Sequence, residues 1–376
     1  MLKIQSTARV PAAHDAIARL RTIADGIFDR ATTVDVAASF PTDDIAALAG
    51  VGLLVAPLPS SAGGEGLATD IEAVAHLSAL LQTVGEASLT VGRLFEGHCN
   101  AILLVERFGG PMAALAAEAA AGRISAVWNA QRGAGLTAHR DRGGWRLKGG
   151  KIHCSGAGSI ARPLVTAHPA GDDRPLMMLV DMASAGIRID LSVWQAAGMR
   201  GTATGTLDFD DVFVPDDDVV GLPGDYYQAP LFAGGAWRVI AVQLGGMRRV
   251  LALQAAHLER SGRGGDAVVR HRFAAAAGAF EAARLIVAEA SCRATDAATA
   301  AEAAVAYVDL ARSSFEILAL QIIDIARRNV GLSAFIGPDP LDRCCRDLET
   351  YLRQPMIDAS RDNAAAYLLA RGGVFG

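Results

Sequence analysis

The sequence WQAAGMRGTATG occupies residues 194–205 and runs directly into TLDFDDVFVP at residues 206–215. Two glycines, Gly198 and Gly201, permit a tight backbone path, and we expect Arg200 to anchor it. The alternating residues that follow predict a β-strand, and Pro215 ends it because proline has no N–H to donate within a sheet. This segment therefore predicts a tight turn that leads into a strand.

The spacing of apolar residues changes twice on either side of that turn. From about residue 11 to 120 apolar residues recur at helical spacing, whereas from about 121 to 222 short alternating runs lie between glycine-rich turns. Helical spacing then returns. We therefore predict a mostly α, α+β chain with an N-terminal helical domain (1–120), a middle antiparallel β-barrel or sandwich (121–225) and a C-terminal four-helix bundle (226–376), with helices near 231–260, 267–294, 298–330 and 340–371.

The composition excludes several classes of protein. The chain has 376 residues, of which 51% are hydrophobic and 20% charged, so it is long and apolar enough for a large globular core. A net charge of −5 without a basic tail predicts no nucleic-acid partner. Five cysteines without paired spacing argue against disulfides or a metal site, and no signal peptide or membrane span is evident. We therefore expect a soluble, cytoplasmic protein without a membrane partner.

Four stretches together resemble the acyl-CoA dehydrogenases. The turn and strand at 194–215 are similar to the signature that closes the β-domain of that family. GWRLKGGKIHCSG (144–156) resembles its hairpin against the flavin ring, AVWNAQRG (126–133) its other flavin-facing strand, and PLDRCCRD (340–347) the start of its last long helix, where Arg346 and Asp347 brace the helix. The resemblance implies a flavin between the β-domain and the bundle, and a homotetramer or homodimer.

The resemblance also implies which residues bind the cofactor, FAD or FMN. The family's dinucleotide-binding glycines are reduced to one in RNVGLSA (328–334), and RSGRGG (260–265) replaces another cofactor motif. Both departures indicate weaker FAD binding, binding of FMN, or a reduced flavin that diffuses between proteins. The residues implied in cofactor binding are Trp128, Asn129, Ala130 (where the family usually has threonine), His153, Cys154, Ser155, Arg263 and Gly331.

The catalytic position departs from the dehydrogenases. Many members place a glutamate base eight residues after the Arg-Asp pair, where this chain has Pro355, and proline cannot accept a proton. LRQP (352–355) instead resembles the two-component flavin monooxygenases, the branch that includes dibenzothiophene monooxygenase. There a pocket histidine hydrogen-bonds the oxygenated flavin or accepts a substrate proton. The resemblance therefore implies catalytic roles for His98, Ser155 and Arg353.

Two alternatives stay open from the sequence. The chain could dehydrogenate an acyl-CoA with a base from another helix, such as Glu259, Glu281 or Glu289. It could also be a flavin-free scaffold or binding protein, since its cofactor motifs are degraded. The leading prediction is an oxygen-activating, flavin-dependent oxidoreductase that acts on a small molecule and receives electrons from a separate flavin reductase.

Overall fold

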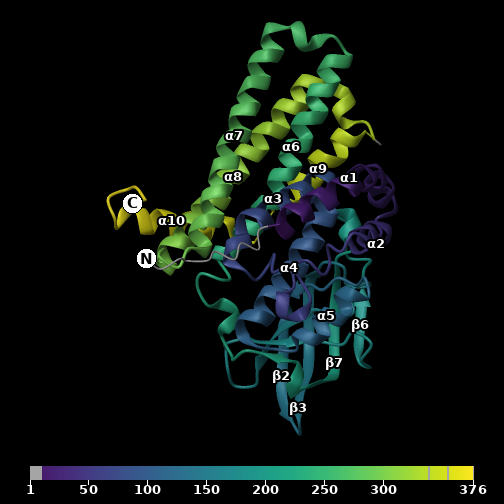
Figure 1. Cartoon of the computed structure of the whole chain (residues 1–376), viewed down its shortest axis with the longest axis vertical. Helices are drawn as coiled ribbons and strands as arrows, with labels where there is room; N and C mark the ends of the chain where they lie inside the picture. The colour runs from purple at the N-terminus through teal and green to yellow at the C-terminus, as the bar shows by residue number, and fades with distance from the viewer. Residues whose placement is uncertain (1–10, 338, 354, 376) are drawn as a thin grey trace, which may run out of the picture.

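The computed structural model describes residues 11–337, 339–353 and 355–375 (Figure 1). Helices come first, a β-sheet follows, and long helices end the chain, so the predicted order of the three segments is confirmed. The first segment contains α1 (Pro11–Ala37), α2 (Thr42–Gly50), α3 (Val74–Ala87), α4 (Leu89–Phe108) and α5 (Met112–Ala120).

Helix α4 is buried along most of its length. Its N-terminus is capped by the Ser88 hydroxyl, which accepts a hydrogen bond from the Val91 N–H. A helix surrounded on all sides belongs to the interior of a large protein. Polar side chains on α4, including Glu96 and His98, are therefore buried and require hydrogen-bonding partners within the protein.

The middle segment is an eight-stranded sheet that extends away from the long helices (Figure 1). Its strand order is β6-β7-β3-β2-β4-β5-β8, and β1 pairs with β4. The strands are β1 (Val127–Trp128), β2 (Gln131–Asp141), β3 (Gly144–Cys154), β4 (Leu164–Pro169), β5 (Leu176–Leu179), β6 (Ile187–Asp190), β7 (Gly205–Pro215) and β8 (Val219–Val220).

The sheet is mixed, so the prediction of a purely antiparallel domain is wrong in this detail. Strands β2 and β3 form an antiparallel hairpin, and β7 occupies the other edge of β3. The chain must therefore cross over before it can pair again. It enters β4 beside β2 and parallel to it, and β1 also pairs with β4 in parallel.

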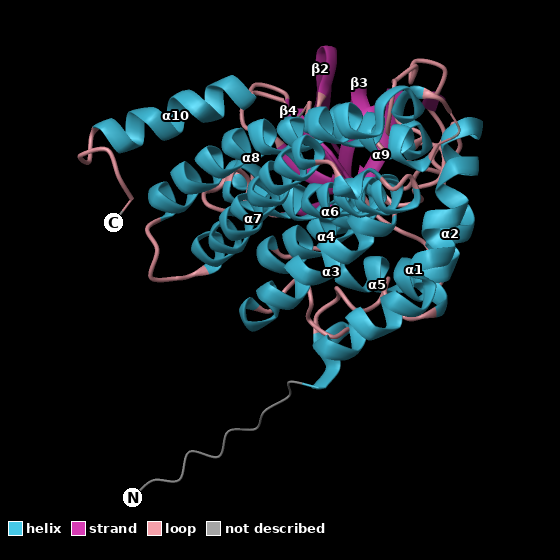
Figure 2. Cartoon of the chain, turned by 90° about the horizontal axis from the view of Figure 1, so that it is seen from above, coloured by secondary structure: helices cyan, strands magenta, loops and turns pink. Residues whose placement is uncertain are grey.

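The last segment holds α6 (Trp237–Arg260), α7 (Ala267–Thr295), α8 (Ala301–Val330), α9 (Pro340–Leu352) and α10 (Ile357–Leu369). The single helix predicted over 340–371 is wrong, because it is divided into α9 and α10. Pro355 cannot continue a helical hydrogen-bond ladder, and Met356 has a left-handed φ of 61°. This break redirects α10, which extends beyond the edge of the bundle in Figure 2.

Two glycines join the first helices to the bundle. A Cβ at Gly85 of α3 would lie 2.0 Å from the Val242 carbonyl oxygen of α6, and one at Gly245 would lie 2.0 Å from the Gln82 carbonyl oxygen. No larger residue fits at either position without a backbone shift. Helices α3 and α6 therefore cross in direct backbone contact, so α6 packs against both the first helical segment and the bundle.

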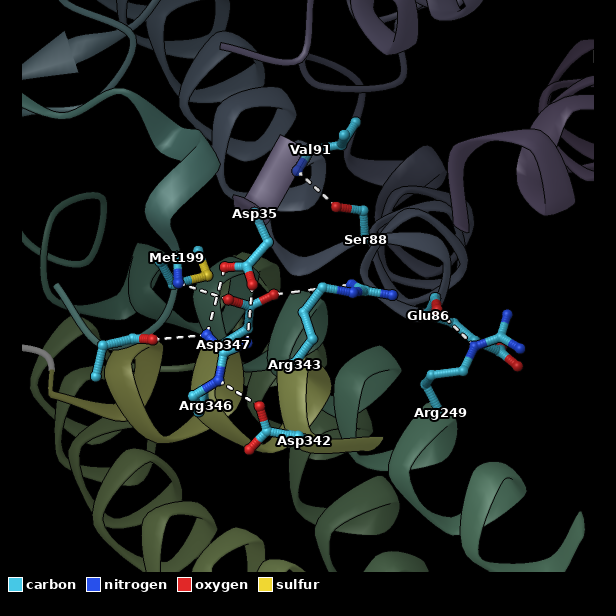
Figure 3. A network of polar contacts seen from close by, with 11 residues as sticks. Asp35, Glu86, Ser88, Val91, Met199, Arg249, Asp342, Arg343, Arg346 and Asp347 are labelled. Carbon is cyan, nitrogen blue, oxygen red and sulfur yellow. Dashed lines mark hydrogen bonds and ion pairs between the residues drawn. The ribbon is translucent and has the colours of Figure 1, made fainter. Parts of the chain in front are cut away.

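A polar network anchors the 194–205 turn to α9 (Figure 3). The Asp347 carboxylate accepts a 2.5 Å hydrogen bond from the Met199 N–H, and Arg346 donates to the Ala197 carbonyl oxygen at 2.7 Å. Arg346 also pairs with Asp35 of α1 at 2.8 Å. The anchor of the turn is thus Arg346 rather than Arg200, and Arg346 and Asp347 brace three segments that are distant in sequence.

Among the described helices, none is both long and apolar enough to cross a membrane.

Candidate active site

A cavity of about 390 Å³ lies where α4, β1 and the last helices meet. Val127 of β1 lines it, so the cavity adjoins the strand predicted to face the flavin. Pro355 and Met356 line it from the α9–α10 connection, and the segment after β8 contributes Tyr226 and Phe232. We call this space the active-site cavity. Pro355 occupies the position at which the resemblance implies a glutamate base in many dehydrogenases. It lines the cavity but has no titratable group.

Four polar side chains of α4 and α6 form a connected cluster on one wall of the active-site cavity. The Arg93 guanidinium and the Asn100 amide both donate to the Glu96 carboxylate, which is 1% exposed. The Asn100 carbonyl oxygen in turn accepts a hydrogen bond from Arg238 Nε. Asn100 therefore separates the Arg93–Glu96 ion pair from the Arg238 guanidinium. Burial lowers the pKa of Arg238, although a guanidinium stays protonated in proteins.

A second ion pair lies across the cavity on α8. Arg312 and Asp309 approach each other to 3.7 Å, and Arg312 also donates to the Pro355 carbonyl oxygen at 3.2 Å and to the Ser360 hydroxyl at 2.8 Å. Arg312 therefore ties the break between α9 and α10 to the bundle. Among the described lining residues the carboxylates are Glu96 and Asp309, and each of them is already paired.

Six of the predicted cofactor residues lie together where β1 and β3 end, and we call this region the sheet edge, although β3 itself is an inner strand between β2 and β7. The Trp128 indole donates to the Ser155 carbonyl oxygen at 3.1 Å, and the Ala130 carbonyl oxygen accepts from the Ile152 N–H. The Asn129 side chain accepts from Thr166 Oγ1 at 2.7 Å. Cys154 is buried at the end of β3, and His153 is exposed beside it. Strands β1 and β3, which the resemblance placed around a flavin, are therefore adjacent.

A buried lysine supports this edge from behind. Lys151 Nζ donates to the Asn129 carbonyl oxygen at 3.0 Å and to Thr166 Oγ1 at 2.9 Å. Its side chain is inaccessible to solvent, and burial lowers its pKa to about 7. The two hydrogen bonds hold the backbone at Asn129 in place, next to the Val127 side chain that lines the cavity.

The Ser155 hydroxyl lies at the end of a chain of hydroxyl groups. Thr202 Oγ1 donates to the Met199 carbonyl oxygen and lies 2.8 Å from Thr204 Oγ1, which lies 3.4 Å from Ser155 Oγ. Because a hydroxyl has one proton and Thr202 uses its own on Met199, Thr204 donates to Thr202, and the 3.4 Å contact between Thr204 and Ser155 Oγ is weak. The 194–205 turn therefore places two hydroxyl groups beside Ser155 at the sheet edge.

Backbone strain also concentrates near this edge. The pairing of β3 with β7 is irregular between Lys151 and Cys154, and the intervening His153 has a φ of 55°. Met199 and Ala203 in the adjoining turn have φ values of 55° and 44°. A non-glycine residue rarely adopts such a conformation, and strained residues of this kind gather at functional sites.

The other two predicted cofactor residues lie elsewhere. Arg263 donates a 2.6 Å hydrogen bond to the Asn329 carbonyl oxygen, so it meets the chain just before Gly331, whose φ is 82°. Both lie at the far end of the bundle, where α6 turns into α7, whereas the sheet occupies the opposite end of the molecule (Figure 1). Within one chain the predicted cofactor residues therefore form two groups.

His98 is buried in α4 with both ring nitrogens hydrogen-bonded to the backbone. Nε2 donates to the Leu54 carbonyl oxygen at 2.9 Å, and Nδ1 accepts from the Ser125 N–H at 3.0 Å. Burial lowers its pKa to about 4, so the ring is neutral near pH 7. Its catalytic role stays a prediction, but this geometry is that of a structural histidine.

Arg353 pairs with Glu316 of α8 at 2.7 Å, and 58% of its side chain is exposed. It lies two residues before Pro355, but it is not among the described residues that line the active-site cavity. The structure thus brings Ser155 to the sheet edge and leaves His98 and Arg353 outside the cavity wall. Their predicted grouping around a flavin remains untested.

The polar cavity residues that sequence reasoning missed include Arg93, Glu96, Asn100 and Arg238 on one wall, and Asp309 and Arg312 on the other. The first three recur at helical spacing in a mostly apolar stretch, which is a weak sign of a polar stripe on a buried helix. Arg238 carries no such sign, because its neighbours in the cluster come from α4, more than 130 residues away in sequence.

No protein-family model and no curated protein matches the chain. Several solved structures, however, are similar to the chain over nearly its whole length. KijD3, crystallised with FMN and a dTDP-linked amino-keto sugar, has a TM-score of 0.85 at 21% identity over 98% of this chain and 96% of its own. FMN-bound TdsC from Paenibacillus sp. A11-2, a dibenzothiophene monooxygenase, has a TM-score of 0.84 at 20% identity over 95% and 98%. A glutaryl-coenzyme A dehydrogenase complex has a TM-score of 0.84 at 18% identity over 99% and 98%.

Proposed function

Because the chain has the fold of the acyl-CoA dehydrogenases, we propose that it is a flavin-dependent oxidoreductase that activates oxygen to modify a small molecule. A bound flavin would supply the electron transfer and the reaction with oxygen. The polypeptide would bind and orient the flavin and the substrate, and would keep bulk water out.

The active-site cavity carries this proposal. It adjoins β1, and Pro355 lines it where a dehydrogenase would need a proton acceptor. Glu96 and Asp309 are both engaged with arginines, so neither is a free base. Two of the similar structures contain FMN, which supports the choice of cofactor. Because the described cavity wall offers no unpaired carboxylate, a reaction without a carboxylate base fits this site better than α,β-dehydrogenation does.

The sheet edge fits a flavin ring in its donor chemistry. The Ser155 hydroxyl makes only a long contact with Thr204, so it can turn to donate to a ligand, and such a donor stabilises the negative charge of a reduced ring. The strained backbone at His153 turns that residue outward, away from the buried Cys154. The cavity beside Val127 would then hold the substrate against the same edge.

Acyl-CoA dehydrogenation is the second candidate function, and one observation supports it. Glu96 is a carboxylate in the cavity wall, whereas the three glutamates considered from the sequence do not line it. Glu281 and Glu289 pair with arginines on their own helix, and Glu259 is exposed near the end of α6. Among the described lining residues, a dehydrogenase reaction would therefore have to use Glu96 or Asp309 as its base.

A flavin titration of the Ser155→Ala variant tests the proposed cofactor site. Loss of one hydrogen bond to a bound ring should weaken flavin binding about 10-fold, which corresponds to about 1.4 kcal/mol. Fluorescence quenching of FMN and FAD measures it, with Ser159→Ala, in the exposed turn just beyond, as the matched control. Equal affinities of all three proteins would remove Ser155 from the flavin site.

A further inference from the structure

Arg238 is the charge left over in the active-site cavity once the ion pairs are formed. Arg93 pairs with Glu96, and Arg312 pairs with Asp309. Arg238, however, is only 8% exposed, and its one hydrogen bond within the described part of the chain goes to the neutral Asn100 amide. A buried guanidinium without a carboxylate partner is costly, because its lost hydration is not replaced.

The orientation of Asn100 makes this charge effective within the cavity. Its amide nitrogen faces Glu96 and its carbonyl oxygen faces Arg238, so the carboxylate is already used by Arg93 and Asn100. Arg238 is also the second residue of the 24-residue helix α6, whose N-terminus adds positive potential at the same place. The Glu96 carboxylate still acts on Arg238 electrostatically, but the described lining residues carry three arginines against the two carboxylates Glu96 and Asp309. The excess of positive charge favours an anion.

Arg238 lies in the wall between two cavities. Arg238 lines the active-site cavity and also a second cavity of about 500 Å³, and Leu231 and Gly235 belong to both walls. A Cβ at Gly235 would lie 2.5 Å from Arg238 Nη2, so glycine leaves room for the guanidinium in this dividing wall. The Trp237 ring lies 5.4 Å from it.

The rest of the active-site cavity suits an apolar, flat molecule. Its volume of about 390 Å³ falls within the usual range for small-molecule sites. Apolar and aromatic side chains also line the cavity. They are Leu104, Val127, Tyr226, Phe232, Val239 and Val305.

We propose that the substrate is an aryl carboxylate, with its carboxylate on Arg238 and its ring against the apolar wall beside Val127. Only the statement that this ligand is the substrate rests on the proposed function, because the carboxylate site itself is argued from Arg238 and the cavity. Arg238 supplies planar, paired donors that match a carboxylate, and the anion supplies the missing counter-charge. The ring would then lie beside Val127 of β1.

Binding of matched acids and amides tests the proposal without turnover. Benzoate and 2-naphthoate should bind about 10- to 100-fold more tightly than benzamide and 2-naphthamide, since a hydrogen bond to a charged group contributes about 1.5–3 kcal/mol. Isothermal titration of the purified full-length protein measures the four affinities. Equal affinities for acid and amide, or no detectable binding of either acid, would overturn the assignment.

Three variants separate recognition by Arg238 from general electrostatics. Arg238→Met should abolish the preference for acids, and because it removes an uncompensated buried charge its melting temperature should not fall. Arg238→Lys should keep part of the preference. Gly235→Ala should reduce it with the charge retained, because the added methyl displaces the guanidinium. Arg284→Met, an arginine of α7 that pairs with Glu281, is the control and should keep the full preference.

The result is independent of the flavin. If the acid preference is present and is lost in Arg238→Met, the carboxylate site stands even when the protein binds no flavin, and the proposed oxidoreductase function alone fails. If flavin binds but acids and amides bind alike, the oxidoreductase function stands and the aryl carboxylate assignment fails.

Discussion

At the scale of single residues, His98 has surroundings that do not match the catalytic role implied by the resemblance. The resemblance implies a catalytic histidine, whereas the ring lies between the Leu54 carbonyl oxygen and the Ser125 N–H and is 1% exposed. Nε2 joins α4 to the segment after α2, and Nδ1 joins α4 to the chain just before β1. A proton acceptor with a pKa of about 4 would also be a weak base near pH 7.

We predict that His98→Gln changes stability and its pH dependence more than turnover. The folded-state pKa of about 4 is below the ordinary 6.5, so the unfolded chain binds more protons between these values. Stability is then full above pH 6.5 and falls as the pH drops toward 4, by about 3 kcal/mol for a shift of this size. His98→Gln should be less stable at pH 7 but flatter in its pH profile.

Denaturant unfolding of the wild type and His98→Gln at pH 7 and pH 5 measures this. His139→Gln, on the exposed side of β2, is the control and should follow the wild type. If the folded variant keeps its stability profile but loses turnover, the catalytic role implied by the resemblance is right and the structural role is wrong.

Some contacts of the candidate site could be predicted from the sequence, and others could not. Trp128 and Ser155 lie in two stretches that resemble flavin-facing strands, and the structure joins them by a hydrogen bond. The Arg238–Asn100 contact depends on how α4 crosses α6, which no local pattern encodes. Motifs therefore predicted the sheet edge, whereas the polar wall of the cavity required tertiary packing.

At the scale of elements, α9 shows how a short motif organises distant segments. Asp347 is 3% exposed, and burial raises its pKa to about 6. It accepts from the Met199 N–H and lies 3.8 Å from Arg343, which is also buried. The motif was predicted to brace the last helix, and the structure shows that it also fixes the turn beside Ser155.

We predict that Asp347→Ala destabilises the protein by about 3–5 kcal/mol, because Arg343 becomes a buried charge without its nearest carboxylate. The Met199 N–H also loses its acceptor, so flavin affinity should fall together with stability. Thermal unfolding and a flavin titration measure both effects. Asp358→Ala, on α10 with 93% of its side chain exposed, is the control. Wild-type stability in Asp347→Ala would show that the network in Figure 3 contributes little.

The helix predicted over 340–371 shows that apolar spacing alone does not determine where a helix ends. Apolar spacing alone favours one helix over 340–371, but Pro355 interrupts it. A proline inside a helical pattern can produce a kink or a break, and the direction of the following helix depends on its contacts. Here Arg312 of α8 holds the Pro355 carbonyl oxygen and Ser360, which determines where α10 begins.

At the scale of the whole molecule, the predicted cofactor residues form two separate groups. The sheet edge lies at one end, and Arg263 with Gly331 lies at the other (Figure 1). A single flavin could contact both groups only if a second copy of the chain supplied one of them. The sequence could not reveal this distance, although the resemblance implies an oligomer.

We predict that Arg263→Ala weakens the binding of FAD about 10-fold, as expected for one hydrogen bond to a charged group, and leaves FMN binding unchanged. The reason is that only FAD is long enough to extend from the sheet edge to the bundle of another copy. Flavin titration measures both affinities, with Arg260→Ala of the same turn as the control. Equal losses for FMN and FAD would contradict a cofactor shared between copies.

We propose that this chain directs the reaction of a reduced flavin with oxygen. Stopped-flow absorbance of the protein with reduced FMN, mixed with aerated buffer, tests it most directly. We predict a transient spectrum that belongs to neither reduced nor oxidised flavin and that forms only when the protein is present. Reoxidation without such a transient, at the rate of free FMN, would contradict the proposed oxygen-activating function.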